Sequence, residues 1–389
     1  MDCDDNGEIS LMKVYGRFPV SEFLEDMVVY RNLEPVDRRL MPLESIRQEV
    51  DLPPGRIPRK SEPDYAKTIV HLLKQARALG APGVEIERLI FIGDTRLNDG
   101  TAFDNLCRAG KWPGLAFIGS ENDQPTATET ISTPSGQSVF LANRWGALVE
   151  FEEFCGRQGF QIDEATAVII DLDKTALGAR GRNAHVIDGA RLQAVQDTVA
   201  GLLGDAYDSA AFKAVYDRLN QVEFHPFTTD NQDYLAYICL ILGSGLYDPD
   251  SMIAEIRSGK LASFREFIDQ VDGQAGSLPP ALAGVHAEIY ANVKAGDPTP
   301  FKSFRRNEYL TTVGRMGQLD DASSVDELLI GEILITQEVR ALALDWKKRG
   351  ALLFGLSDKP DEASIPTAEL ATRGYQPIHR TATHAVGRE

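Results

Sequence analysis

The chain has 389 residues, of which 43% are hydrophobic and 25% are charged, and this composition excludes a disordered or fibrous protein. The 58 Asp and Glu residues outnumber the 40 Lys and Arg residues. The resulting net charge of -18 indicates that nucleic acid is not a partner, because its phosphate backbone would be repelled. The length predicts two compact bodies, or one domain that carries a large insertion.

The sequence shows no pattern typical of export, of a disulfide framework or of a membrane span. Residues 1–10 (MDCDDNGEIS) are acidic, whereas a signal peptide begins basic and then becomes apolar. The four cysteines form no CxxC pair, which favours reduced thiols in a cytoplasm. The most apolar run, residues 234–247, is shorter than the roughly 20 residues of a membrane span and predicts a buried helix. We therefore expect a cytoplasmic protein with no membrane partner.

Apolar runs rich in branched residues predict the buried strands of a parallel sheet, in chain order residues 88–94 (RLIFIGD), 114–119 (GLAFIG), 166–173 (TAVIIDLD) and 351–358 (ALLFGLSD). Helical patterns lie before or after these runs, at residues 64–79, 101–109, 144–158 and 338–349. The alternation predicts an α/β fold, a Rossmann-like parallel sheet with helices on both faces.

Other segments differ from this alternation. Residues 190–334 carry amphipathic helical patterns with few strand signals, which predicts a helical body inserted into the sheet domain. Residues 121–138 are polar and without periodicity, and we expect them to form an exposed connection. The first fifty residues are ambiguous.

The third apolar run ends in Asp171-Leu-Asp173-Lys-Thr175. Two carboxylates two residues apart at the end of a strand can face one cleft, one as nucleophile and the other as proton donor. Burying both is costly without a cation between them or a raised pKa on one. The alternative is an Asp-rich turn that caps a helix, in which Asp173 and Thr175 bond main-chain amides.

Two further runs end in polar groups. GDTRLND supplies Asp94 and Asp99, whose carboxylates are hard oxygen ligands suited to Mg²⁺; the alternative is a turn with Asp99 as N-cap of the next helix. LLFGLSDKP places Ser357 at a strand end, where a hydroxyl and main-chain amides suit a phosphoryl oxygen, although a plain helix cap explains it equally.

Together the three motifs resemble the signature set of the haloacid dehalogenase-like (HAD) superfamily, most of whose members are Mg²⁺-dependent phosphatases that act through an aspartyl-phosphate. DLDKT is similar to the family's DxDxT motif, GLSDKP to its serine motif and GDTRLND to its acidic GD motif. The order differs, because GDTRLND comes before DLDKT here and last in the usual family chain. This difference predicts a circular permutation, or a second, partial copy; termini that lie close together make permutation tolerable.

The resemblance also implies roles for single residues. Asp171 would be the nucleophile and Asp173 the acid and base; Ser357 and a lysine would hold phosphoryl oxygens, and Thr175 would orient the nucleophile loop. The predicted Mg²⁺ ligands are Asp171, the carbonyl of Asp173, Asp94 and Asp99. The lysine motif of a permuted chain points to Lys60, with Lys67 and Lys359 as rivals and a solvated loop charge as the alternative.

The resemblance implies a HAD-like core in two parts, residues 1–178 (with an N-terminal extension of unclear role) and 338–389, and a helical cap at residues 179–337. At the start of this cap Arg180 and Arg182 are expected to be surface charges of a hinge, the alternative being that they bind a substrate anion. Asp173 argues against carbon–halogen hydrolysis, which needs no acid for the leaving halide.

The predicted function is hydrolysis of a small phosphorylated substrate, with substrate identity and oligomeric state left open. The alternatives are a phosphotransferase or phosphomutase with the same intermediate, and an inactive HAD-like binding or regulatory module. A further alternative treats residues 1–160 as an unrelated domain whose GD turn never meets DLDKT. Contact between Asp94 and Asp171 decides that last alternative.

Overall fold

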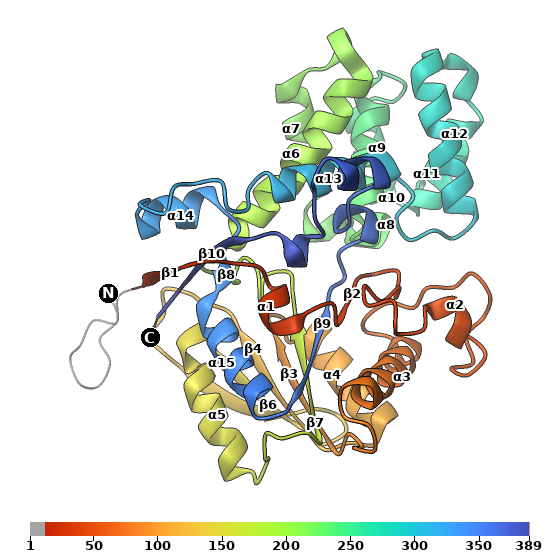
Figure 1. The fold of residues 1–389 in the computed structure, drawn as a ribbon. Helices are drawn as coiled ribbons and strands as arrows, with labels where there is room; N and C mark the ends of the chain where they lie inside the picture. The colour runs from red at the N-terminus through yellow and green to blue at the C-terminus, as the bar shows by residue number, and fades with distance from the viewer. Residues whose placement is uncertain (1–11, 389) are drawn as a thin grey trace. The chain divides into compact units, whose positions relative to one another are not determined.

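The computed structural model describes residues 12–388 and is a mixed α/β protein (Figure 1). The chain divides into two compact units, a sheet unit formed by Met1–Gly189 with Thr312–Glu389, and a helical unit, Ala190–Thr311. The helical unit falls inside the range 179–337 predicted for the cap, while residues 179–189 and 312–337 belong to the sheet unit. That the helical unit acts as a cap stays a prediction.

A seven-stranded sheet forms the centre of the sheet unit. Its spatial order is β2 (Val28–Val29), β9 (Leu352–Leu356), β7 (Thr166–Asp171), β3 (Arg88–Gly93), β4 (Gly114–Gly119), β6 (Ser138–Ala142) and β5 (Thr128–Ser132). All neighbours are parallel except β5, which runs antiparallel to β6. Every residue of β4 and β7 is buried, which explains why such strands read as continuous apolar runs. The four predicted strands β3, β4, β7 and β9 are confirmed.

Helices cover both faces of this sheet, as predicted. Successive side chains of a strand point to opposite faces. Ala116 of β4 belongs to a core shared with α3 (Pro63–Gly80) and α4 (Asn98–Gly110), whereas its neighbour Phe117 lies with its ring centroid 5.6 Å from that of Phe151. Phe151 belongs to α5 (Leu148–Arg157), and α15 (Gln337–Lys348) packs beside α5.

Residues 121–138, expected to form an exposed connection, are mostly exposed, but they also contain a strand that was not predicted, β5, and the first residue of β6. Four of the five β5 residues are exposed and it pairs with β6 alone. A strand exposed on both faces needs no apolar alternation, so its sequence carries no strand signal.

Segments from both ends of the described chain form a second, three-stranded sheet, with β10 (Thr383–Gly387) between β1 (Lys13–Phe18) and β8 (Ile335–Thr336). The ambiguous first fifty residues therefore supply one strand to each sheet, β1 here and β2 beside β9 in the large sheet. The short helices of the sheet unit are α1 (Ser21–Leu24), α2 (Leu43–Ile46), α14 (Val325–Gly331) and α16 (Ala368–Thr372).

The helical unit has a hydrophobic core of its own. Its helices are α7 (Ser209–Leu219), α8 (His225–Thr228), α9 (Gln232–Gly243), α10 (Pro249–Ser258), α11 (Phe264–Asp272) and α12 (Pro280–Lys294), and α6 (Ala184–Leu203) and α13 (Lys302–Val313) extend from it into the sheet unit. The buried helix predicted at residues 234–247 is confirmed as α9. Among the described residues, no helix combines the length and apolar character needed to cross a membrane.

Candidate functional site

The three predicted motifs end at one edge of the large sheet. The strands that precede them, β9, β7 and β3, are neighbours in this order, and they run parallel. Their register pairs Ile92 with Ile170 and Asp171 with Leu356. Asp94, Asp171 and Ser357 therefore lie at the carboxyl ends of adjacent strands, where open α/β sheets bind their ligands.

Three carboxylates converge at this edge. Asp94, Asp99 and Asp171 each offer an oxygen atom, and these atoms all lie within 4.8 Å of one another. All three residues are buried, with 7%, 2% and 4% of their surfaces exposed. We call these three residues the acidic cluster. The alternative in which the GD turn never meets DLDKT is wrong, because the cluster joins Asp94 to Asp171.

The turn after β3 positions Asp99. Its Oδ2 accepts hydrogen bonds from the main-chain N–H groups of Asp94 at 3.0 Å and Thr95 at 2.8 Å. Gly93 makes room for this carboxylate, since a Cβ at that position would lie 2.8 Å from the Asp99 side chain. Asp99 is therefore not the N-cap of α4: it lies within the helix, and its side chain bonds the turn that precedes it.

Lys60 bridges two members of the acidic cluster. Its Nζ lies 2.6 Å from Oδ1 of Asp99 and 2.6 Å from Oδ1 of Asp171, and 96% of its side chain is shielded from solvent. The alternative that Lys60 is a solvated loop charge is wrong. Of its two rivals, Lys67 forms a surface ion pair with Asp64 at 2.9 Å, and Lys359 is buried, with its main-chain N–H donating to Ser357 Oγ at 3.0 Å.

Arg180 compensates the third carboxylate. Its Nε donates to Oδ2 of Asp94. The Arg180 side chain keeps 36% of its surface exposed, while that of Asp94 keeps 6%. Arg182 differs, because only 3% of its side chain is exposed and it forms ion pairs with Glu121 and Glu338. The expectation of a surface charge is therefore wrong for Arg182.

The electrostatics of the cluster favour a bound cation. Burial and the neighbouring Asp99 raise the pKa of Asp94 to about 7 in spite of Arg180. Burial also raises the pKa of Asp171 well above its usual range, although Lys60 opposes this shift. Burial would raise the pKa of Asp99 as well, but Lys60 together with hydrogen bonds that involve Asp94 and Thr95 outweighs burial and lowers that pKa to about 2. Two cations thus incompletely compensate three buried carboxylates, and a divalent ion would favour their ionised forms.

Two buried hydroxyl groups have no hydrogen-bond partner among the described residues, Tyr65 Oη at the start of α3 and Thr175 Oγ1 in the loop after Asp171. Burial raises the pKa of Tyr65, and Lys60, Asp171 and Asp99 are among the charges that act on it. Buried hydroxyls are normally satisfied, so these two are available to bind water or substrate, although Tyr207, Thr312 and Ser364 also carry unpaired buried hydroxyls. Three hard carboxylate donors together with unpaired hydroxyls fit a divalent cation and its bound water or substrate.

The remaining predicted residues surround the cluster. Asp173 is half-buried in the loop after β7, and its carboxylate is not one of the three that converge. Thr175 is buried in the same loop, whose shape depends on main-chain bonds such as the one from the Ala176 N–H to the Asp171 carbonyl at 3.1 Å. Ser357 is buried directly after β9 and donates its main-chain N–H to Val29. The roles predicted for these three residues stay predictions.

Sequence reasoning missed Tyr65 and the contact of Arg180 with Asp94. A usable signal existed for Tyr65: it lies five residues after Lys60, at the start of α3, and Pro63 marks the first turn of that helix. No local pattern marks the Arg180 contact, because it joins a loop after β7 to a turn after β3.

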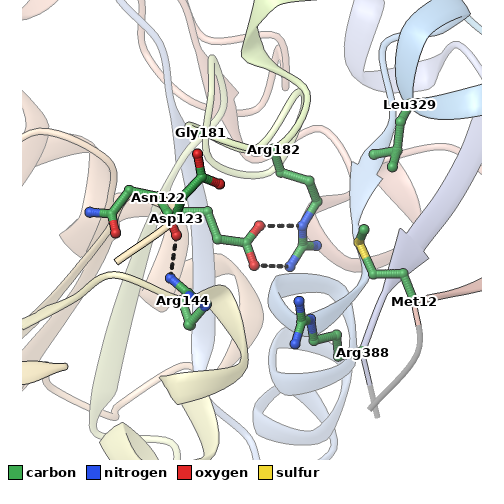
Figure 2. A pocket seen from close by; sticks show the side chains of 9 residues that line it. Met12, Asn122, Asp123, Arg144, Gly181, Arg182, Leu329 and Arg388 are labelled. Atoms are coloured by element: carbon green, nitrogen blue, oxygen red, sulfur yellow. Dashed lines mark hydrogen bonds and ion pairs between the residues drawn. The ribbon is translucent and has the colours of Figure 1, made fainter. Parts of the chain in front are cut away.

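A cavity of about 340 Å³ lies at the ends of other strands and uses none of the predicted site residues. Figure 2 shows Arg144, Arg182 and Arg388 around it. Arg144 donates to the carbonyls of Asn122 at 2.6 Å and Gln124 at 2.7 Å, and Arg182 is held by its ion pairs. These two guanidinium groups therefore stabilise the loops that follow β4, β6 and β7.

Comparisons of the chain with protein-family models, with curated proteins and with solved structures found no match.

Proposed function

We propose that the chain is a Mg²⁺-dependent phosphomonoester hydrolase of the HAD-like superfamily that acts through an aspartyl-phosphate on a small phosphorylated metabolite. The observation that carries the proposal is the convergence of Asp94 and Asp99, from the GD motif, with Asp171, from the DLDKT motif. Two motifs separated in sequence would not meet in a buried cluster if each were only a helix cap.

The sheet order supports a circularly permuted HAD-like core. The chain visits the three motif strands in the order β3, β7, β9, whereas in the sheet β7 lies between β3 and β9. The strand that carries Asp171 is thus flanked by the strands that carry the other two motifs. Because the chemistry depends only on this spatial arrangement, the order of the motifs along the chain does not affect it.

Asp171 would attack phosphorus, forming an oxygen–phosphorus bond as the bond to the leaving oxygen breaks. Asp173 would protonate that leaving oxygen, and then take a proton from the water that attacks the phosphorylated Asp171 and releases inorganic phosphate. Mg²⁺ held by Asp94, Asp99, Asp171 and the carbonyl of Asp173 would supply charge stabilisation to the transferring group.

Lys60 fits a double role. Its ammonium group has three N–H donors, and Asp99 and Asp171 each lie within hydrogen-bond distance of it. The third donor is left for a phosphoryl oxygen, which Ser357 would bind from the neighbouring strand end. Thr175 Oγ1, which has no partner among the described residues, would orient the nucleophile loop once the site is loaded.

One observation favours a second function. Lys60 and Arg180 already contact all three carboxylates, as in a purely structural ion-pair network. An inactive HAD-like binding module would keep such a network. A phosphotransferase or phosphomutase would keep the same intermediate and pass the phosphoryl group to an acceptor other than water.

Phosphate release from an aryl phosphate tests the proposal, with Mg²⁺ or with EDTA, for the wild type, Asp171→Asn and Asp94→Asn. Asp104→Asn is the matched control, because Asp104 is also a buried carboxylate, but it bonds Ser135 away from the cluster. We expect activity that requires Mg²⁺, falls about 10³-fold or more in both cluster variants and persists in the control. Equal activity in all proteins would refute the hydrolase. Mg²⁺ binding without turnover would favour the binding module, and release of aryl alcohol in excess of phosphate with an added acceptor would favour the transferase.

A further inference from the structure

We propose that Arg180 binds the phosphoryl group of the substrate with its terminal nitrogen atoms while its Nε holds Asp94. This inference rests on the proposed phosphatase function and adds a substrate-binding residue that none of the three motifs contains. It also assigns the function of the segment that joins the nucleophile loop to α6.

The main chain of Arg180 is fixed on both sides. Its N–H donates to the carbonyl of Lys174 at 2.8 Å, within the nucleophile loop. Its carbonyl accepts from the main-chain N–H of Glu121 at 3.0 Å and from the indole Nε1 of Trp145 at 3.1 Å. The loops after β4 and β6 therefore hold the backbone from which the Arg180 side chain extends.

The next residues add to this restraint. Gly181 has a φ of +78°, and a Cβ there would lie 1.8 Å from the Glu121 carbonyl oxygen, so the two segments pack backbone to backbone. Arg182 forms ion pairs with Glu121 at 2.6 Å and Glu338 at 2.8 Å, both almost fully buried. The Arg180 side chain thus starts from a fixed point, which is the requirement for a preorganised binding group.

The guanidinium group has donors to spare. Its Nε–H is used on Asp94, and no other hydrogen bond of the Arg180 side chain forms with the described residues. The four N–H bonds of Nη1 and Nη2 remain, on a side chain that is 36% exposed above a carboxylate that is 6% exposed. A planar pair of such donors matches two oxygens of a phosphoryl group, which a lysine cannot do.

The net charge of the site also favours binding of the phosphoryl group by Arg180. Lys60 and a bound divalent cation would balance the three carboxylates of the acidic cluster and would leave the site neutral. Arg180 adds one positive charge, so a phosphoryl dianion meets a net attraction at the point where it must bind. A residue that served only to neutralise Asp94 would have no function once the cation is bound.

The test uses orthovanadate as the probe of the phosphoryl subsite and Mn²⁺ as the probe of the metal subsite. Vanadate affinity in the presence of Mg²⁺ is measured by calorimetry and by inhibition of aryl phosphate hydrolysis, and Mn²⁺ affinity by electron paramagnetic resonance. The variants are Arg180→Gln and Arg180→Lys. Arg96→Gln is the matched control, because Arg96 lies exposed in the turn between Asp94 and Asp99 and its loss removes the same charge.

We expect Arg180→Gln to weaken vanadate binding tenfold or more and to raise KM, with Mn²⁺ affinity unchanged or higher. Arg180→Lys should recover only part of the loss, and Arg96→Gln should match the wild type. Wild-type vanadate affinity in Arg180→Gln would overturn the inference, as would an equal loss of vanadate and Mn²⁺ binding, which would make Arg180 a support for Asp94 only. A wild type that binds Mn²⁺ but neither binds vanadate nor hydrolyses aryl phosphates would instead refute the proposed function itself.

Discussion

The replacement Lys60→Met tests the electrostatics of the acidic cluster most strictly. Methionine keeps most of the length and the apolar stem beside the ring of Phe91, over which the ammonium lies at 5.5 Å, but removes the charge. Asp99 and Asp171 would then stay buried with Arg180 as the remaining cation that contacts the cluster. Breaking a buried ion pair by removing one partner costs about 3–5 kcal/mol.

An independent estimate agrees with this range. Asp99, whose carboxylate Lys60 helps to keep ionised, can escape the loss of Lys60 by taking up a proton, which at pH 7 costs about 4 kcal/mol for a group with an ordinary Asp pKa near 3.9. The pKa of that carboxylate in the folded variant would lie above its unfolded value, so the penalty is largest at high pH. It should fall by about 1.4 kcal/mol per pH unit as the pH decreases toward 4. We expect a loss of about 3–4 kcal/mol at pH 7 in EDTA.

Urea unfolding followed by tryptophan fluorescence measures this loss. Trp112, Trp145 and Trp346 are the three tryptophans of the chain, and all are buried in the sheet unit, so their emission reports the unit that contains the cluster. Lys67→Met is the control, because its surface pair with Asp64 should contribute less than about 1 kcal/mol. If Lys60→Met were as stable as Lys67→Met, or if its loss did not depend on pH, the account of the cluster would be refuted.

Three further predictions concern stability. Tyr65→Phe removes a buried hydroxyl without a described partner, so urea unfolding should show unchanged or slightly higher stability, and a loss above about 1 kcal/mol would contradict this. Gly181→Ala should destabilise far more than Gly136→Ala, which has a similar positive φ but no atom within 4 Å of the new Cβ and should cost about 1 kcal/mol; equal losses would disprove the close approach to Glu121. Burial raises the pKa of Asp361 to about 7, so the folded state holds its proton more tightly and this group lowers stability as pH rises from 4 to 7. Asp361→Asn should reduce the pH dependence of the free energy of unfolding in this range by up to about 1 kcal/mol per pH unit. An unchanged pH dependence would contradict the prediction.

Much of the sheet could be predicted because each buried parallel strand is a continuous apolar run that ends in a polar group. RLIFIGD, TAVIIDLD and ALLFGLSD gave both the strands and the residues at their carboxyl ends. That these ends lie at one edge follows from parallel pairing. The convergence of Asp94 with Asp171 also required β3 and β7 to be neighbours in the sheet, which the sequence left open.

Other parts of the site could not be derived from the sequence. Lys60 was the candidate and Lys67 a rival, and the sequence alone could not exclude Lys67. The start of α3 at Pro63 leaves Lys60 in the loop before the helix and Lys67 on the exposed side of the helix. The Arg180 contact joins two loops, and a long-range pairing between loops leaves no periodic pattern in either segment. β5 was missed for a different reason, since its exposed residues follow no burial pattern.

The most direct measurement is chemical trapping of the phosphorylated intermediate. The protein is mixed with a phosphorylated substrate and Mg²⁺, quenched during turnover and reduced with borohydride, which converts an aspartyl-phosphate to homoserine, and the peptides are then analysed by mass spectrometry. We predict homoserine at position 171 alone, present with Mg²⁺ and absent with EDTA. Phosphate release without modification at Asp171, or modification at another carboxylate, would contradict the assignment of Asp171 as the nucleophile.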